Sequence, residues 1–327
     1  MKLRHILRTT STACVLATSA AFCIPAGAVN LTVTHWADGM FGAPFTVALE
    51  KGYFKEAGVD VTGFLTSAGG GTTVRNAMAS EIPYGEVALP AAIAAIKQGV
   101  DLTIVHAGVI SLADIYWVAK ADSPLNSIAD LSGKKLGYSS PKSVTDMVST
   151  LALNKAGLLD KVERRSVGSL SGALTALRQD AVDVVYNTEP AYTREKSTLK
   201  MVFRSTDLLP NTTQTVGVVR TEYLKKNPDV IKAIIAARRK GVEFIQSNPG
   251  EAGEILARQY KLPVDIAKTA IANILAAKGT YWSTGKFDYD GMKTMLTGLQ
   301  LVKAIEPGPF DWDKIVDESL MQPDQRK

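Results

Sequence analysis

Four short segments carry the groups that could hold a small molecule, and each follows a stretch of β-forming residues. The run Thr66 to Thr73 reads TSAGGGTT, with three glycines just before a helix-like segment. Glycine lets a ligand approach the backbone closely, and the free amides of a helix's first turn attract an anion. The run does not fit a Walker loop or the dinucleotide pattern G-x-G-x-x-G. A flexible turn is the alternative interpretation.

The second segment, Tyr138 to Thr145, reads YSSPKSVT and crowds three serines around a predicted helix start. One serine is expected to cap the helix. The remaining hydroxyl groups and the free amides could form a compact cradle for an oxyanion. Lys142 either adds positive charge to this cradle or is simply solvated.

Aromatic rings flank polar turns in the other two segments. His35 to Gly42 reads HWADGMFG, and Tyr186 to Pro190 reads YNTEP. Such turns can present hydrogen-bonding groups while the rings form the walls of a pocket. Ordinary turns with aromatic side chains in the core are an equally good interpretation of both segments.

The sequence offers little for catalysis. Only His35 and His106 follow the N-terminal leader as histidines, and both cysteines lie within that leader. Neither G-x-S-x-G nor H-E-x-x-H occurs. The pair Asp311 and Asp313 is explained by capping and solvation, and clustered metal ligands are missing from the pattern. We therefore expect a protein that is not an enzyme and that carries neither cofactor nor metal.

The elements that position these segments alternate along the first two thirds of the chain. The predicted strands are 31–35, 59–65, 102–105, 115–119, 135–138, 162–167, 182–186 and 213–220. The predicted helices are 43–52, 72–80, 90–98, 144–156 and 170–179. Short strands alternating with helices predict parallel sheets covered by helices, and ligands of such sheets bind at the carboxyl ends of the strands.

The last hundred residues are predicted to be almost entirely helical. Asn227-Pro228 and Asn248-Pro249 are typical helix starts, because Asn can cap free amides and Pro is tolerated at the first helical position. Leu262-Pro263 begins another helix. The charged run 238–240 interrupts an apolar stripe, and we expect it to be a solvated helix face.

The N-terminus has the three parts of an export signal. Lys2, Arg4 and Arg8 form a positive region, and 13–24 is mostly apolar and composed largely of small residues. Ala26-Gly27-Ala28 gives the small-x-small pattern of a cleavage site, so we expect export to the periplasm with cleavage near Ala28. The apolar run is shorter than the roughly 20 residues that span a bilayer.

The length after the leader is sufficient for two domains of common size, and the charge is unremarkable. The net charge is +5, of which the leader contributes three, so the remaining 299 of 327 residues carry about +2. Nucleic-acid binding needs a concentrated basic patch, which the sequence lacks. We expect a monomer without a nucleic-acid partner.

The order of several motifs resembles one family. The first runs Pro44-Phe45-x-x-Ala48-x-x-Lys51-Gly52-Tyr53-Phe54-Lys55-x-x-Gly58-Val59-x-Val61. Further matches are 67–70, 76–80, 127–137, 156–158 and 173–183 with Pro190. Over residues 31–220 the chain resembles the periplasmic binding proteins of the nitrate/sulfonate/taurine type, which belong to the sulfonate-binding and thiamine-pyrimidine-synthase-like superfamily.

The resemblance implies an α/β fold of periplasmic binding protein type II. Each of two lobes would be a mainly parallel sheet flanked by helices, with a helical C-terminal tail. The implied units are a signal peptide at 1–28, lobe 1 at 29–113, lobe 2 at 114–212, and a return to lobe 1 at 213–327. Hinge strands would lie near 111–117 and 209–217.

The resemblance also implies a function and a site. The chain would capture a small anion, such as a sulfonate, taurine or nitrate, and deliver it to the permease and ATPase of an ABC importer at the inner membrane. An aromatic acid or a pyrimidine precursor is the alternative ligand, and a periplasmic sensor subunit is the alternative role. The predicted ligand contacts are Trp36, Asp38, Gly39, Phe41, Ser67, Gly70, Gly71, Thr72, Leu89, Pro90, Ser139, Ser140, Ser143, Val144, Thr145, Tyr186, Asn187 and Glu189.

Overall fold

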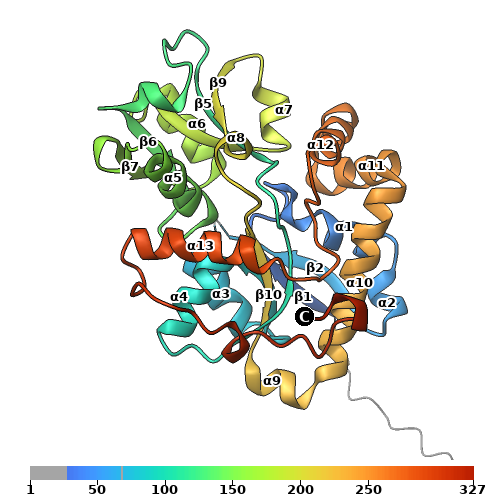
Figure 1. The fold of residues 1–327 in the computed structure, drawn as a ribbon. Helices are drawn as coiled ribbons and strands as arrows, with labels where there is room; N and C mark the ends of the chain where they lie inside the picture. Colours follow the sequence, from blue (N-terminus) through green and yellow to red (C-terminus); the bar gives the residue numbers. More distant parts are fainter. Residues whose placement is uncertain (1–27, 68) are drawn as a thin grey trace, which may run out of the picture.

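The computed structural model describes residues 28–67 and 69–327, which form two α/β lobes, one above the other in Figure 1. The predicted leader up to Gly27, with Cys14 and Cys23, lies outside the described residues. Ala68 of the glycine-rich run also lies outside them.

The first lobe is built on a five-stranded sheet in the order β2-β1-β3-β10-β4. Its strands are β1 (Val29–Val33), β2 (Val61–Leu65), β3 (Tyr84–Ala88), β4 (Thr103–Ala107) and β10 (Thr215–Val219). Its early helices are α1 (Ala43–Glu50), α2 (Tyr53–Glu56), α3 (Gly70–Ala79) and α4 (Leu89–Lys97). Strand β1 runs parallel to β2 and β3, whereas β10 is antiparallel to β3 and β4. Every residue of β3 and β10 is buried, as expected for inner strands covered on both faces.

The second lobe repeats this plan in the order β7-β6-β8-β5-β9. Its strands are β5 (Ile115–Lys120), β6 (Lys135–Tyr138), β7 (Glu163–Ser166), β8 (Val184–Thr188) and β9 (Leu199–Arg204). Its helices are α5 (Val144–Lys155), α6 (Leu170–Arg178), α7 (Ala191–Glu195) and α8 (Ser205–Leu208). Strand β6 is parallel to β7 and β8, and β5 is antiparallel to β8 and β9.

Two passages connect the lobes and touch each other. The chain leaves the first lobe through 108–114 and returns through 209–214, and the amide of Gln214 donates to Val109 O at 2.7 Å. Each passage leads directly into an antiparallel strand, β5 or β10, so both sheets are mixed rather than mainly parallel. The predicted two-lobed fold class is confirmed. Division of the chain at residues 113 and 212 stays a proposal, which the membership of the two sheets supports.

The C-terminal third is mostly helical, as predicted, although 277–288 and 302–327 form turns, bends and short 3-10 segments. Its helices are α9 (Thr221–Lys226), α10 (Pro228–Ser247), α11 (Pro249–Tyr260), α12 (Val264–Ala276) and α13 (Tyr289–Leu301). Short 3-10 turns are η1 (Met40–Gly42), η2 (Ile128–Leu131), η3 (Leu159–Lys161), η4 (Trp312–Lys314) and η5 (Pro323–Gln325). The prediction that Asn227 and Asn248 cap α10 and α11 with their side chains is wrong. Neither accepts a capping hydrogen bond, and Asn227 Nδ2 instead donates to Tyr223 O at 3.3 Å.

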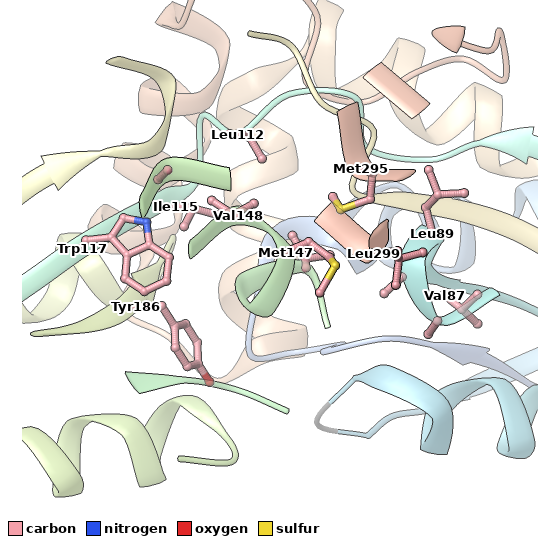
Figure 2. Close-up of a cluster of buried hydrophobic side chains, with 14 of the residues drawn as sticks. Val87, Leu89, Leu112, Ile115, Trp117, Met147, Val148, Tyr186, Met295 and Leu299 are labelled. Carbon is pink, nitrogen blue, oxygen red and sulfur yellow. The ribbon is translucent and has the colours of Figure 1, made fainter. Parts of the chain in front are cut away.

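One apolar cluster extends from lobe to lobe through α13. Met147 and Val148 of α5 lie in the centre of Figure 2, beside Met295 and Leu299 of α13. A Cβ atom on Gly298 would lie 3.1 Å from Met147 Cβ, so the two helices approach closely. Burial of this apolar surface holds α13 of the C-terminal region against the second lobe.

A buried ion pair corrects the prediction for 238–240. Arg238 is 1% exposed, and its Nε donates to Glu86 Oε2 on β3 at 2.6 Å. Lys240 on the same helix is exposed and pairs with Glu56, as a solvated face requires. The buried face of α10 therefore includes one arginine, because the carboxylate of Glu86 on β3 pairs with it in the core.

Within residues 28–67 and 69–327, no helix combines the length and the apolar character needed to cross a membrane.

Candidate ligand-binding site

A narrow cavity of about 30 Å³ lies between the lobes. Its lining residues are His35, Asp38, Gly39, Phe41, Asp114, Ile115, Ser139, Val144, Thr145, Leu170 and Thr188. The first lobe supplies the turn after β1, the first passage supplies Asp114, and the second lobe supplies the starts of α5 and α6 and the end of β8. The carboxyl ends of strands from both sheets therefore meet at one cavity, as the predicted topology requires.

The lobes are closed on each other in this conformation. A Cβ atom on Gly70 of the first lobe would lie 3.0 Å from Ser140 Oγ and 3.2 Å from Pro141 O of the second. Gly70 also has a φ of 62°, which glycine adopts without strain. A cavity of this size has room for only a few water molecules, so a larger ligand requires the lobes to separate.

The turn after β1 is built from its own backbone. His35 and Ala37 adopt positive φ angles of 49° and 67°, and the amides of Asp38 and Gly39 donate to His35 O. The His35 ring meets Phe41 edge-on, with centroids 6.1 Å apart. Burial lowers the pKa of His35 to about 4, so the imidazole is neutral at pH 7. Partial burial raises the pKa of Asp38, which lies at the exposed rim.

The start of α5 forms the opposite wall. Ser143 caps the helix by accepting a hydrogen bond from the amide of Asp146 at 3.1 Å, as one serine was predicted to do. Thr145 Oγ1 accepts from the amide of Ser139 at 2.9 Å and shares a hydrogen bond with its hydroxyl group. Ser140 Oγ is buried without a hydrogen-bond partner among the described residues. Hydroxyl groups and amides are thus gathered here, beside a helix N-terminus that favours negative charge.

The carboxylate of Asp114 forms the floor between these walls. The residue is 0% exposed, and its Oδ1 accepts from Gln214 Nε2 of the second passage at 2.7 Å. Its Oδ2 is buried and has no partner in the described part of the chain. Burial raises the pKa of Asp114 to about 6, and the nearby charge of Glu189 adds to the shift. This residue joins the cavity to the contact between the two passages.

The lining combines negative and neutral polar groups. It includes the carboxylates of Asp38 and Asp114, a neutral imidazole and several hydroxyl groups, and none of the lining residues is lysine or arginine. Across the described ranges, no group of three or more His, Cys, Asp or Glu residues is arranged to hold a metal ion. The lining can therefore accept hydrogen bonds, and the N-termini of α5 and α6 beside it favour negative charge.

A second polar cluster joins the lobes beside the cavity. Asn273 of α12 donates to Glu189 Oε1 at 2.8 Å and to Thr193 Oγ1 at 3.1 Å, across the contact between α12 and α7. The buried Glu189 also accepts from Tyr116 and Thr193 hydroxyl groups. Glu189 thus serves the lobe contact and does not line the cavity.

Six of the predicted contact residues line the cavity: Asp38, Gly39, Phe41, Ser139, Val144 and Thr145. Their role toward a ligand stays a prediction. The other predicted contacts are not among the lining residues: Trp36, Ser67, Gly70, Gly71, Thr72, Leu89, Pro90, Ser140, Ser143, Tyr186, Asn187 and Glu189.

The predicted aromatic walls are held elsewhere. Trp36 packs between Phe64 and Tyr260, and its indole donates to Thr46 Oγ1 at 2.9 Å. Tyr186 is buried and donates to Gly168 O at 2.9 Å. Both rings face partners within one lobe, so Phe41 is the aromatic side chain that reaches the cavity.

The predicted contacts omit five lining residues: His35, Asp114, Ile115, Leu170 and Thr188. His35 lies within a segment that the sequence marks as a possible ligand turn. Asp114 directly precedes the apolar run of β5, and an acidic residue at such a position is a signal that could have found it. Leu170 follows the N-cap Ser169 of α6, which nothing in the sequence distinguishes from other helix starts.

Comparison with known proteins gives a family and relatives. A family model described as NMT1/THI5 like matches residues 42–252. The chain is 28% identical over 147 residues to a Brucella abortus protein named as a putative binding protein, a match covering 43% of this chain and 46% of the relative. It is 27% identical over 214 residues to the formylaminopyrimidine-binding protein of Halalkalibacterium halodurans, covering 64% of each. The chain thus spans about half to two thirds of these relatives.

Solved structures share the fold. The periplasmic aliphatic sulphonate binding protein SsuA of Escherichia coli superposes with a TM-score of 0.70 at 18% identity, covering 92% of this chain and 95% of SsuA. The periplasmic nitrate-binding protein NrtA of Synechocystis gives 0.73 at 15% identity, covering 90% and 86%. The desulfurization enzyme DszB gives 0.62 at 14%, covering 89% and 97%. At such identities the likeness shows the fold alone.

Proposed function

Because the chain belongs to the NMT1/THI5-like family, we propose that it is the substrate-binding component of an ABC importer. The observation that carries this proposal is the cavity lined from both lobes and from the passage between them. The family match also confirms the resemblance to periplasmic solute-binding proteins that the motif order indicated.

The mechanism is closure of two lobes around a ligand. Each lobe supplies part of the lining, so a ligand binds the closed state better than the open state and shifts the population toward it. The passages at 108–114 and 209–214 connect the lobes and would serve as the hinge. The closed, ligand-bound form is then the one that the permease and ATPase would receive.

The place of action follows from the same reasoning. Solved relatives of this fold are described as periplasmic, and the N-terminal pattern predicts export. We infer that the protein works in the periplasm as a monomer. A sensor subunit would use the same closure, and transporter-dependent uptake in cells that lack the chain would discriminate between the roles.

An enzymatic role has less support. DszB shares the fold at a TM-score of 0.62, yet residues 28–327 of this chain contain no cysteine to serve as a nucleophile. The cavity holds one imidazole and two carboxylates, and no hydrogen bond among the described residues pairs a nucleophile with a base there. We therefore keep binding without turnover as the proposed activity.

The ligand is a small organic molecule. The N-terminus of α5 supports an anionic group, as predicted, while the lining carboxylates and the formylaminopyrimidine-binding relative support the pyrimidine alternative. We expect a thermal-shift screen of sulfonates, nitrate, aromatic carboxylates and pyrimidines to reveal a stabilising ligand, because a ligand of the folded state alone raises the melting temperature.

Closure is the second measurement of this test. Small-angle scattering with and without the stabilising ligand should report a change in the radius of gyration as the lobes redistribute between open and closed forms. A panel in which no compound stabilises the protein, together with scattering that never changes, would reject the binding-protein proposal.

A further inference from the structure

The unpartnered oxygen of Asp114 favours a ligand that supplies a hydrogen-bond donor. Asp114 is 0% exposed, Gln214 satisfies Oδ1, and Oδ2 has no partner among the described residues. A buried carboxylate oxygen without a hydrogen bond is costly, and a donor supplied by the ligand would remove that cost. The hydroxyl group of Tyr281 is buried beside this carboxylate and is likewise without a hydrogen-bond partner among the described residues, so two neighbouring polar groups remain unsatisfied here.

The opposite wall has the complementary preference. The first-turn amides of the 12-residue helix α5 have no intrahelical acceptors, and Ser143 satisfies that of Asp146. Val144 and Thr145, the first two residues of the helix, line the cavity beside Ser139. This end of the cavity therefore favours an acceptor or a negative charge.

From the unpartnered oxygen of Asp114 and the helix start on the opposite wall, we infer that Asp114 determines specificity and that the ligand carries two different polar groups. It carries an N–H donor, as an amine or an amino group on a ring, for Asp114 Oδ2. It also carries an acceptor or anionic head for the start of α5. This inference rests on the proposed function and names the ligand class of the same cavity.

Simple anions do not fit this arrangement. Nitrate or an unsubstituted alkanesulfonate offers no donor, so the buried carboxylate of Asp114 would face a like charge without a hydrogen bond. The lining contains no lysine or arginine that could offset this repulsion. A zwitterion or an amino-heterocycle can donate to Asp114 and also offer an acceptor to the start of α5.

Asp114 also connects ligand contact to closure. Its Oδ1 and the carbonyl oxygen of Ser111 both accept from Gln214 Nε2, and its own carbonyl oxygen accepts from the amide of Glu189. A donor on the ligand therefore engages a residue that holds the two passages together. Gain of this hydrogen bond favours the closed form in which it can be made.

Matched probe pairs test the inference on the wild-type protein. Taurine and ethanesulfonate share a sulfonate but differ in the amino group, and 4-aminopyrimidine and pyrimidine differ in the same way. By calorimetry we expect the amino member of at least one pair to bind at least tenfold more tightly than its partner. Equal affinities within both pairs, tighter binding of the members without an amino group, or no binding by any probe would overturn the inference.

Variants locate the discrimination. Asp114→Asn should reduce the preference for the amino member at least tenfold, whereas Asp160→Asn, at an exposed carboxylate of η3 that does not line the cavity, should leave the preference unchanged. Melting curves establish whether each variant folds. If a variant does not fold, the comparison of matched probe pairs on the wild-type protein still tests the inference. An unchanged preference in a folded Asp114→Asn variant would remove Asp114 from the role. Binding of an anion without an amino group, with closure, would leave the proposed function intact while overturning the ligand class.

Discussion

Two buried carboxylates, one in the first lobe and one in the passage that leaves it, differ in how completely they are hydrogen-bonded. Glu86 on β3 is 0% exposed, and both of its oxygens are bonded, Oε2 to Arg238 at 2.6 Å and Oε1 to the hydroxyl group of Thr215 at 2.7 Å. Asp114 is equally buried, yet one of its oxygens has no partner among the described residues. A satisfied buried charge holds a fold together, whereas an unsatisfied one beside a cavity is available to a ligand.

The largest effect is expected where the satisfied carboxylate loses its partner. Arg238→Ala leaves Glu86 charged and unpaired in the core, and breaking such a pair costs about 3–5 kcal/mol. Urea denaturation should show this loss in the free energy of unfolding. Lys240→Ala on the same helix removes an exposed pair with Glu56 and should cost less than about 1 kcal/mol. Equal effects of the two substitutions would contradict the structural role of Arg238.

The next effect concerns the pH dependence of stability. The folded-state pKa of Asp114 is about 6, above the ordinary 3.8. Between about pH 4 and pH 6 the folded state therefore binds this proton more tightly than the unfolded state does. Stability therefore falls as pH rises from about 4 to about 6, by roughly 2–3 kcal/mol. Asp114→Asn lacks this contribution.

Comparison of the two proteins isolates that contribution, because His35 and His106 titrate in both. The free energy of unfolding of Asp114→Asn minus that of the wild type should increase between pH 4 and pH 7. Denaturation at several pH values measures the difference. A flat difference would show that Asp114 is not an unfavourable buried charge.

A smaller effect is expected at the closest approach of the lobes. Alanine at Gly70 would place its Cβ 3.0 Å from Ser140 Oγ and would hold the lobes apart. We expect about tenfold weaker ligand binding by calorimetry, which corresponds to about 1.4 kcal/mol. Gly71→Ala is the control for an added methyl group, since its Cβ meets only the end of Arg75 at 3.5 Å. Melting curves measure separately the strain of alanine at the φ of 62° of Gly70. A loss of affinity in Gly71→Ala as large as that in Gly70→Ala would contradict closure as the cause.

The smallest effect is expected at the α12–α7 contact. Asn273→Ala removes two hydrogen bonds across the lobes, but Glu189 keeps those from Tyr116 and Thr193. Affinity should fall about two- to threefold, which corresponds to about 0.4–0.7 kcal/mol, at the low end for a hydrogen bond because Asn273 is only partly buried. Titration of the ligand identified in the thermal-shift screen measures this change, with Asn76→Ala on α3, which is not a lining residue of the cavity, as a control.

Much of the fold could be predicted from local pattern. The helix over 144–156 appears as α5 (Val144–Lys155) because a polar cap, an apolar face and a glycine stop are all properties of neighbouring residues. Strands β3 and β9 were not among the predicted strands. The run Tyr84–Ala88 is wholly buried, so it lacks the alternation that marks a half-exposed strand.

The candidate site was likewise predictable only where local pattern decides it. Ser139, Val144 and Thr145 could be predicted, because the start of a helix after a strand is both a local pattern and a place where ligands bind. Trp36 could not be assigned correctly, because its packing partners Phe64 and Tyr260 are distant in sequence. The same holds for Tyr186, whose phenol is satisfied by the backbone at Gly168.

The sequence by itself determined the alternation of strands and helices, the family and the capping of α5 by Ser143. Only the tertiary structure decided that Arg238 is a core residue and that Asp114 faces the cavity. Glu86 and Arg238 are 152 positions apart, and Asp114 and Gln214 are 100 apart. Periodicity reports which side of an element a residue occupies, but whether a buried charge finds a partner depends on chain segments brought together by folding.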